Sequence, residues 1–149
     1  MRQFVTFRID GHLLGLDVLL VREINRVLDI TPVPRAPEFV RGLINLRGQI
    51  VTVFDLGVRL GLEPRSIDEE THNVILKRDA VGLLVDAIGD VAQSEAEEIE
   101  PPPANVGGIG AEFMEGVVKL ENELLVVLSA DRLLGQAGPQ AQEAPGLTG

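Results

Sequence analysis

The stretch from Ile30 to Leu62, ITPVPRAPEFVRGLINLRGQIVTVFDLGVRLGL, decides the fold because a proline-rich segment leads into two short apolar runs. Residues 43–46 and 50–54 predict two β-strands, and Arg47-Gly48 between them predicts a tight hairpin turn. Glycine accepts a positive φ without steric cost, so Gly48 suits such a turn. A long arginine at the tip is less expected. It makes Arg47 the first candidate for function, with an ordinary solvated turn residue as the alternative.

Further short elements are predicted on both sides of this hairpin. Strands are expected at residues 4–9, 13–18, 73–77, 81–85, 116–120 and 123–128. A short helical turn leading into a strand is expected within residues 18–24, and short capped helices are expected at 56–60 and 129–134. The glycine-rich run 105–110 is expected to be a flexible loop, and residues 137–149 a disordered tail.

The second half of the chain repeats the first. FVRGLINLRGQIVTVFDLGVRLG, starting at Phe39, aligns without a gap with FMEGVVKLENELLVVLSADRLLG, starting at Phe113. Two copies of a unit of about 60 residues with several short strands predict a pair of small antiparallel barrels. Arg47-Gly48 becomes Glu121-Asn122 in the second copy, so a tight turn is expected in both. Core formation therefore does not require an arginine at the tip.

The composition favours a soluble, intracellular protein that binds other proteins. Of the 149 residues, 45% are apolar and none is cysteine, which excludes disulfides and thiolate chemistry. Residues 1–66 carry nine arginines and seven acids, net +2, whereas residues 67–149 carry four basic residues and sixteen acids, net −12. An acidic chain is a poor general binder of nucleic acid. No leader and no apolar run long enough to cross a bilayer is present, so no membrane insertion is expected.

The sequence offers few side chains that are suited to catalysis. His12 and His72 have no metal-ligand partners at a suitable spacing, and the three serines lie outside any nucleophile motif. The glycines at 107–110 lack the Lys-Ser/Thr of a phosphate loop, and the acids at 95–100 lack calcium-loop spacing. We therefore expect no enzyme activity, no cofactor and no metal. An enzyme or a small-ligand barrel remains the alternative from another class.

The quoted stretch, together with GLDVLLVREI from Gly15 and VGLLVDAIGDV from Val81, resembles the CheW family of chemotaxis coupling proteins. The resemblance covers about residues 4–135. It implies a mainly β fold of two five-stranded SH3-like barrels in one CheW-like domain, with short helical turns. The expected domain is 1–136, with barrels at roughly 4–66 and 73–136 between which terminal strands can exchange. The implied role is a non-enzymatic scaffold that joins the cytoplasmic tip of transmembrane chemoreceptors to the regulatory domain of the histidine kinase CheA.

The resemblance also implies a receptor-binding site. Arg47 matches the family's arginine at the receptor-binding surface, and Val21 and Glu23 match apolar and acidic positions beside the same groove. The alternative for Val21 is an ordinary core residue, and Gly42 is expected to serve the backbone rather than to contact a partner. The implied location is the cytoplasm, at the inner face of the membrane.

Three positions depart from the family pattern, namely Leu14, Thr52 and Gly57. They raise a second hypothesis, a paralogue that serves pilus motility or surface sensing, or that binds the kinase without a receptor.

Overall fold

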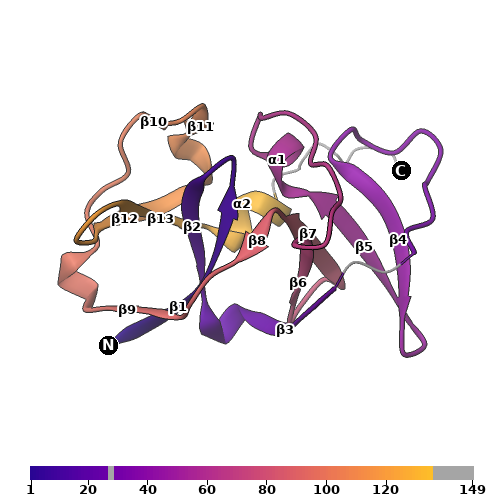
Figure 1. Ribbon diagram of the computed structural model, residues 1–149, viewed down its shortest axis with the longest axis horizontal. Coiled ribbons are helices and arrows are strands. Elements are labelled where there is room, and N and C mark those ends of the chain that lie inside the picture. The colour runs from indigo at the N-terminus through magenta and orange to yellow at the C-terminus, as the bar shows by residue number, and fades with distance from the viewer. Residues whose placement is uncertain (27–28, 136–149) are drawn as a thin grey trace.

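The computed structural model describes residues 1–26 and 29–135, which form two β-sheets lying side by side (Figure 1). The five-stranded sheet has the order β3 (Val21–Arg26), β6 (His72–Leu76), β7 (Val81–Val85), β5 (Gln49–Asp55) and β4 (Val40–Leu46). The six-stranded sheet has the order β12 (Met114–Lys119), β13 (Leu124–Leu128), β2 (His12–Asp17), β1 (Arg2–Ile9) and β8 (Ala87–Ile88), with β9 (Ala92–Ser94) also paired to β1. The prediction of a mainly β fold is confirmed.

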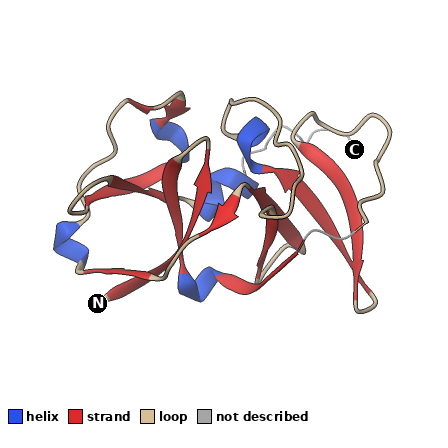
Figure 2. Cartoon of the chain, viewed as in Figure 1, coloured by secondary structure: helices blue, strands red, loops and turns tan. Residues whose placement is uncertain are grey.

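The helices are short connecting pieces, as Figure 2 shows. They are η1 (Val18–Leu20), α1 (Leu56–Arg59), η2 (Ala96–Glu98), η3 (Ala111–Phe113) and α2 (Ala130–Leu134). Side chains cap both α-helices as expected: Asp55 accepts from the amide of Val58, and Ser129 accepts from the amide of Arg132. In the described part of the chain, no helix is long and apolar enough to span a membrane. The tail predicted at 137–149 lies outside the described residues.

The two sheets do not follow the order of the chain. The N-terminal hairpin β1–β2 joins the six-stranded sheet, where β2 runs parallel to β13, and the hairpin β6–β7 joins the five-stranded sheet, where β7 runs parallel to β5. Both sheets are therefore built from distant parts of the chain. The expected barrels at 4–66 and 73–136 are therefore not separate along the chain. The hairpin β1–β2 joins the strands β12 and β13 of the second range, and the hairpin β6–β7 joins the strands β4 and β5 of the first range.

The internal repeat is visible in the backbone of both sheets. Leu43 forms an isolated bridge with Thr31, and Val117, 74 residues further on, forms one with Glu100. Each bridge ties an outer strand, β4 or β12, to the segment that follows the strand at the other edge, β3 or β9. Each sheet thus curls back on itself as an SH3-like barrel would, and one bridge in each sheet ties an edge strand to the other edge.

Three apolar cores hold this arrangement. One lies inside the five-stranded sheet (Ile44, Leu46, Val51, Val53, Ile75, Leu84), and one lies inside the six-stranded sheet (Phe4, Leu13, Val118, Leu125, Val127). The third and largest lies between the sheets and takes residues from both, including Phe7, Leu16, Leu76, Leu83 and Val126. This shared core packs the two sheets against each other.

The glycine-rich run at 105–110 differs from the flexible loop expected there. It forms the small hairpin β10 (Asn105–Val106) and β11 (Ile109–Gly110), with Gly107 and Gly108 at positive φ in the turn. The side chain of Ile109 is fully buried in the core between the sheets. The expectation was wrong because composition alone does not show that a tertiary pocket buries this isoleucine.

Arg59 fastens the two repeats together. Its guanidinium carbon lies 4.9 Å from the ring centres of both Phe39 and Phe113, the first residues of the two copies. Its Nε donates to the carbonyl of Leu133 at 2.8 Å, and Nη2 donates to that of Arg132. Burial lowers the pKa of Arg59, partly offset by the charge of Glu112. The cation therefore sits in a partly desolvated slot between two aromatic faces.

Replacing Arg59 with leucine is expected to lower the free energy of unfolding by about 2–3 kcal/mol, since two cation–π contacts and two hydrogen bonds are lost. Because the chain has no Trp or Tyr, urea unfolding should be followed by far-UV circular dichroism. Arg132→Leu is the control, because that exposed guanidinium donates one hydrogen bond, to Glu112. If both variants unfold with the same free energy, Arg59 does not stabilise the contact between the two repeats.

Candidate functional site

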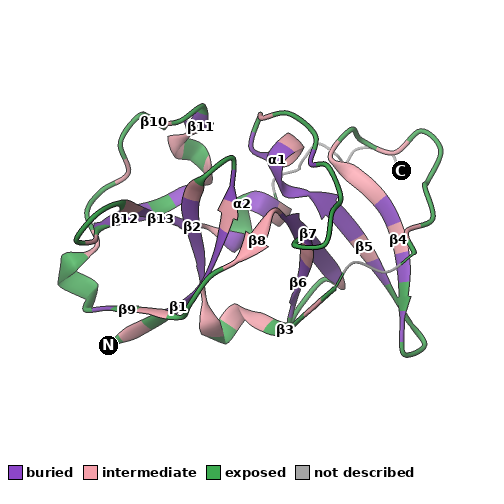
Figure 3. Cartoon of the chain, viewed as in Figure 1, coloured by how far each residue is buried: buried purple, intermediate pink, exposed green. Residues whose placement is uncertain are grey.

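The turn that carries Arg47 has the backbone its sequence predicts. Arg47 has a φ of 51° and Gly48 a φ of 88°, the two left-handed residues of a tight hairpin turn. The side-chain oxygen of Asn45 accepts from the amide of Gly48 at 2.8 Å and fixes this turn. The Arg47 side chain is 64% exposed at the tip, which Figure 3 shows as an exposed end of the β4–β5 hairpin.

The second copy does not repeat this turn. Residues 121–123 form a bend between β12 and β13, closed by a hydrogen bond from the amide of Leu120 to the carbonyl of Glu123. Of the described residues with positive φ, none is Glu121 or Asn122. Both hairpins therefore turn within two residues, but the second lacks the left-handed backbone of the first, so the two differ in backbone as well as in charge.

Arg47 forms an ion pair with Glu23 across the seam, which we define as the junction between β3 and β4, the outer strands of the five-stranded sheet. Nη2 of Arg47 donates to Oε2 of Glu23. β3 and β4 lie at opposite ends of the strand order, so only the curling of the sheet brings these two side chains together. Glu23 is 25% exposed, so the partly buried carboxylate holds the more exposed guanidinium in place.

A second contact crosses the seam beside the first, and the sequence gave no reason to expect it. Nη1 of Arg22 donates to the side-chain oxygen of Gln49, at the start of β5. Nε of Arg22 also lies 3.7 Å from Oε2 of Glu23, the same oxygen that Arg47 contacts. Two guanidinium groups therefore share one carboxylate. Ile50, the next residue of β5, leaves 54% of its surface exposed.

Val21 is not brought to this cluster. It pairs with Leu76, which belongs to the core between the sheets, whereas Glu23 pairs with Ile75, which belongs to the core inside the five-stranded sheet. Paired residues share a face of a sheet, and a register shift separates Val21 from Glu23, so the two side chains lie on opposite faces. Val21 is partly buried against the core between the sheets.

An open pocket lies near the start of β3, on the side of Val21. Its floor includes the buried Met114 and Leu128, and its rim includes Leu20, Arg78 and Asp131. The neighbouring Leu19 is 71% exposed. The segment from Leu19 to Glu23 therefore runs from an apolar depression between the sheets to the charged seam.

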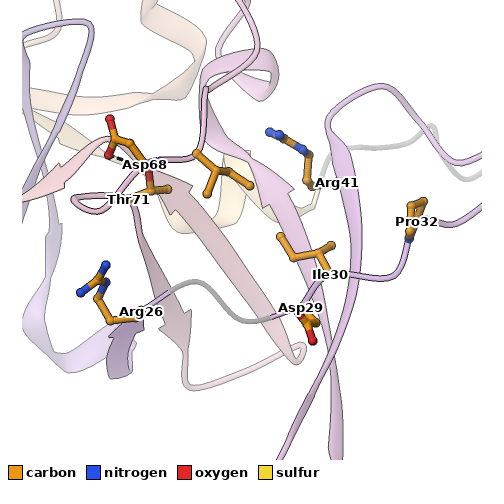
Figure 4. A pocket seen from close by; sticks show the side chains of 8 residues that line it. Arg26, Asp29, Ile30, Pro32, Arg41, Asp68 and Thr71 are labelled. Atoms are coloured by element: carbon orange, nitrogen blue, oxygen red, sulfur yellow. Dashed lines mark hydrogen bonds between the residues drawn. The ribbon is translucent and has the colours of Figure 1, made fainter.

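Another pocket, of about 440 Å³, lies beside the proline-rich connection, as Figure 4 shows. It is lined by Arg26, Asp29, Ile30, Pro32, Arg41, Ile67, Asp68 and Thr71. None of the predicted site residues lines it. Its charges balance, with two arginines and two aspartates around isoleucine side chains, and the hydroxyl of Thr71 donates to Asp68. Within residues 1–26 and 29–135, no group of three or more His, Asp or Glu side chains could hold a metal ion.

Arg65 forms a buried charge cluster that joins the two sheets. Its Nη1 donates to Asp10 at 3.0 Å and to Asp86 at 2.8 Å, and its backbone amide donates to the buried Asp55 at 2.8 Å. Burial opposes the charge on this guanidinium, but the surrounding carboxylates outweigh it, and the pKa of Arg65 is raised. A Cβ on Gly57 would lie 2.4 Å from Nε of Arg65, so the glycine that departs from the family pattern makes room for this side chain.

The fold and the seam together define a two-sheet β protein with a charged cluster at the exposed end of the β4–β5 hairpin. The family model for the CheW-like domain matches residues 3–138, and the chain belongs to this family.

The chemotaxis protein CheW of Treponema pallidum is 34% identical over 137 residues, covering 88% of this chain and 81% of that protein. The scaffolding protein TtCheW of Thermoanaerobacter tengcongensis has a similar crystal structure, with a TM-score of 0.84 and 33% identity over 95% of this chain and 92% of that chain. The protein FrzA of Myxococcus xanthus is 28% identical, covering 94% of this chain and 89% of that protein.

Proposed function

We propose that this protein is a non-enzymatic adaptor of a chemotaxis signalling system, which couples transmembrane chemoreceptors to a CheA-type histidine kinase. Its family membership and its similarity to proteins named for chemotaxis and scaffolding support this role. The single observation that carries the proposal is the exposed Arg47 at the tip of a tight hairpin, held by Glu23 from the far edge of the sheet. The proposed location is the cytoplasm, at the inner face of the membrane, where receptor tips are reached.

Each predicted residue has a distinct part in this proposal. Arg47 reaches the receptor tip, because its side chain is the most exposed of the three. Glu23 sets where the guanidinium lies, since its own carboxylate is mostly covered. Val21 adds apolar contact beside the exposed Leu19, at the end of the segment that borders the depression between the sheets. A helical hairpin such as a receptor tip would pack its apolar side there and place polar groups at the seam.

Reversing the charge of Arg47 tests this assignment. Arg47→Glu is expected to weaken binding to a receptor cytoplasmic fragment roughly 10–100-fold, the usual cost of breaking a close interfacial charge pair. Binding to the kinase should not change, and the unfolding curve should stay within about 1 kcal/mol, as expected for an exposed pair. Both affinities can be measured by titration calorimetry.

Two controls separate direct contact from internal pairing. Glu121→Arg makes a charge reversal of the same size at the equivalent position of the second hairpin and should leave receptor affinity unchanged. The double variant Glu23→Arg/Arg47→Glu restores an internal ion pair with reversed polarity. If the double variant regains receptor binding, the pair is needed only for internal order and Arg47 is not a receptor contact.

A pathway other than flagellar swimming is a second candidate for the same adaptor role. The three departures at Leu14, Thr52 and Gly57 support it. Reconstitution with receptors and kinases from each candidate system distinguishes the two, because only the true pathway gives kinase activity under receptor control.

A further inference from the structure

We propose that Arg22 is a positioning residue that keeps Glu23 compensated when Arg47 turns from Glu23 to a carboxylate on the receptor. This inference rests on the proposed function and deepens it. It names an anionic group as what Arg47 takes from the partner, and it gives Arg22, which no sequence pattern singled out, a part in recognition.

The geometry of the seam carries this inference. Oε2 of Glu23 faces Nη2 of Arg47 and, 3.7 Å away, Nε of Arg22. Arg22 is held in this position, because its Nη1 donates a hydrogen bond to the side chain of Gln49. Arg47 sits on a two-residue turn and is 64% exposed, whereas Arg22 is 34% exposed and lies on the strand itself. The guanidinium of Arg47 can therefore turn toward a partner, whereas that of Arg22 stays beside Glu23.

Charge balance explains why the second arginine matters. Glu23 is 25% exposed, so an uncompensated carboxylate there would be unfavourable. If Arg47 were the sole partner of Glu23, binding of Arg47 to a receptor carboxylate would leave Glu23 without a cation. That loss would oppose receptor binding. With Arg22 beside it, the group of two arginines and one glutamate has a net charge of +1 and can accept one further anion.

The same charge balance defines the partner chemistry. The occupant must bring a carboxylate to Arg47, and Ile50, which is 54% exposed on the same hairpin, offers an apolar contact. A helix with an acidic residue one turn from an apolar residue meets both demands, because side chains three or four apart share a helix face.

The test uses the full chain, a receptor cytoplasmic fragment and four variants. Arg22→Gln is expected to weaken receptor binding roughly 3–10-fold, since Glu23 then holds Arg47 more tightly. Arg22→Gln/Glu23→Gln should bind the receptor more tightly than Arg22→Gln, because the carboxylate that needs compensation is gone, but less tightly than wild type, because Glu23 no longer positions Arg47. Arg26→Gln removes the same charge from the same strand, away from Glu23, and should change affinity less than twofold. Arg47→Glu reports on the proposed function itself.

A measurement without the receptor completes the design. In free protein, hydrogen exchange at the guanidinium of Arg47, followed by NMR, should slow in Arg22→Gln, because the Glu23–Arg47 pair tightens. Unchanged exchange, or receptor affinity unaffected by Arg22→Gln, overturns the inference. Failure of the double variant to recover shows that Arg22 contacts the receptor directly, which also overturns it. If Arg47→Glu itself binds the receptor normally, the proposed site fails instead.

Discussion

Replacing Gly42 with alanine is expected to lower the free energy of unfolding by about 3–5 kcal/mol, a large part of the stability of a small domain. Gly42 has a φ of +149°, and a Cβ there would lie 2.3 Å from the carbonyl oxygen of Thr31 and 2.7 Å from Cγ2 of Ile30. The clash would break the bridge in which Thr31 and Leu43 exchange two hydrogen bonds of 2.8 Å. These bonds contribute about 1 kcal/mol each, and the strained backbone adds 1–3 kcal/mol.

Two further glycines make this result diagnostic. Gly48→Ala introduces the same methyl at a φ of +88° but meets nothing within 4 Å, so it should cost only the strain of about 1–2 kcal/mol. Gly116→Ala, the equivalent change in the second copy, would meet the carbonyl oxygen of Glu100 at 2.5 Å and should be nearly as damaging as Gly42→Ala. Urea unfolding followed by circular dichroism gives all three values. If Gly42→Ala lowers the free energy of unfolding no more than Gly48→Ala does, the carbonyl oxygen of Thr31 does not lie close to Gly42.

Replacing Arg65 with leucine is expected to lower the free energy of unfolding by about 3 kcal/mol. Removing one partner of a buried ion pair typically costs 3–5 kcal/mol, and water can still reach Asp10 and Asp86 in the variant, which moderates the loss. Arg65 is only 6% exposed and contacts Asp10 of the six-stranded sheet's first turn and Asp86 after β7. It also donates to the carbonyl of Glu63. The variant therefore loses a tie between the two sheets.

Arg65→Lys and Arg8→Leu show whether this loss depends on burial and geometry. Lysine keeps the charge but lacks the planar fork that reaches several acceptors, so an intermediate loss is expected. Arg8 pairs with Glu123 at 2.7 Å on the surface, where an ion pair contributes at most about 1 kcal/mol. If Arg65→Leu proves as mild as Arg8→Leu in calorimetric unfolding, the cluster does not stabilise the junction of the sheets.

The strands and the internal repeat were predictable because both depend on local pattern. Two short apolar runs located β4 and β5, and the gap-free match between the segments from Phe39 and Phe113 agrees with the equivalent bridges at Leu43 and Val117. Gly42 was correctly expected to serve the backbone. The tight turn at Arg47-Gly48 followed from turn chemistry, since glycine at its second position favours positive φ.

The misjudged segments are those whose environment comes from distant residues. Ile109 is buried in the core between the sheets, so its glycine-rich hairpin is ordered in a way that composition does not reveal. Glu121-Asn122 connects its strands as briefly as Arg47-Gly48 does, but without the positive φ of its counterpart. The sequence also could not show that a register shift within β3 turns the side chains of Val21 and Glu23 to opposite faces.

The sequence by itself determined the strand order along the chain, the two-copy architecture, and Arg47 as the residue whose presence the core does not explain. Only the tertiary structure decided which strands share a sheet and what Arg47 touches. β3 and β4 stand at opposite edges, and Glu23 and Arg47 meet because the sheet curls until its edges adjoin. The reason is physical: turns and strands follow from contacts between near neighbours, whereas the seam depends on closure of a sheet, to which every strand contributes.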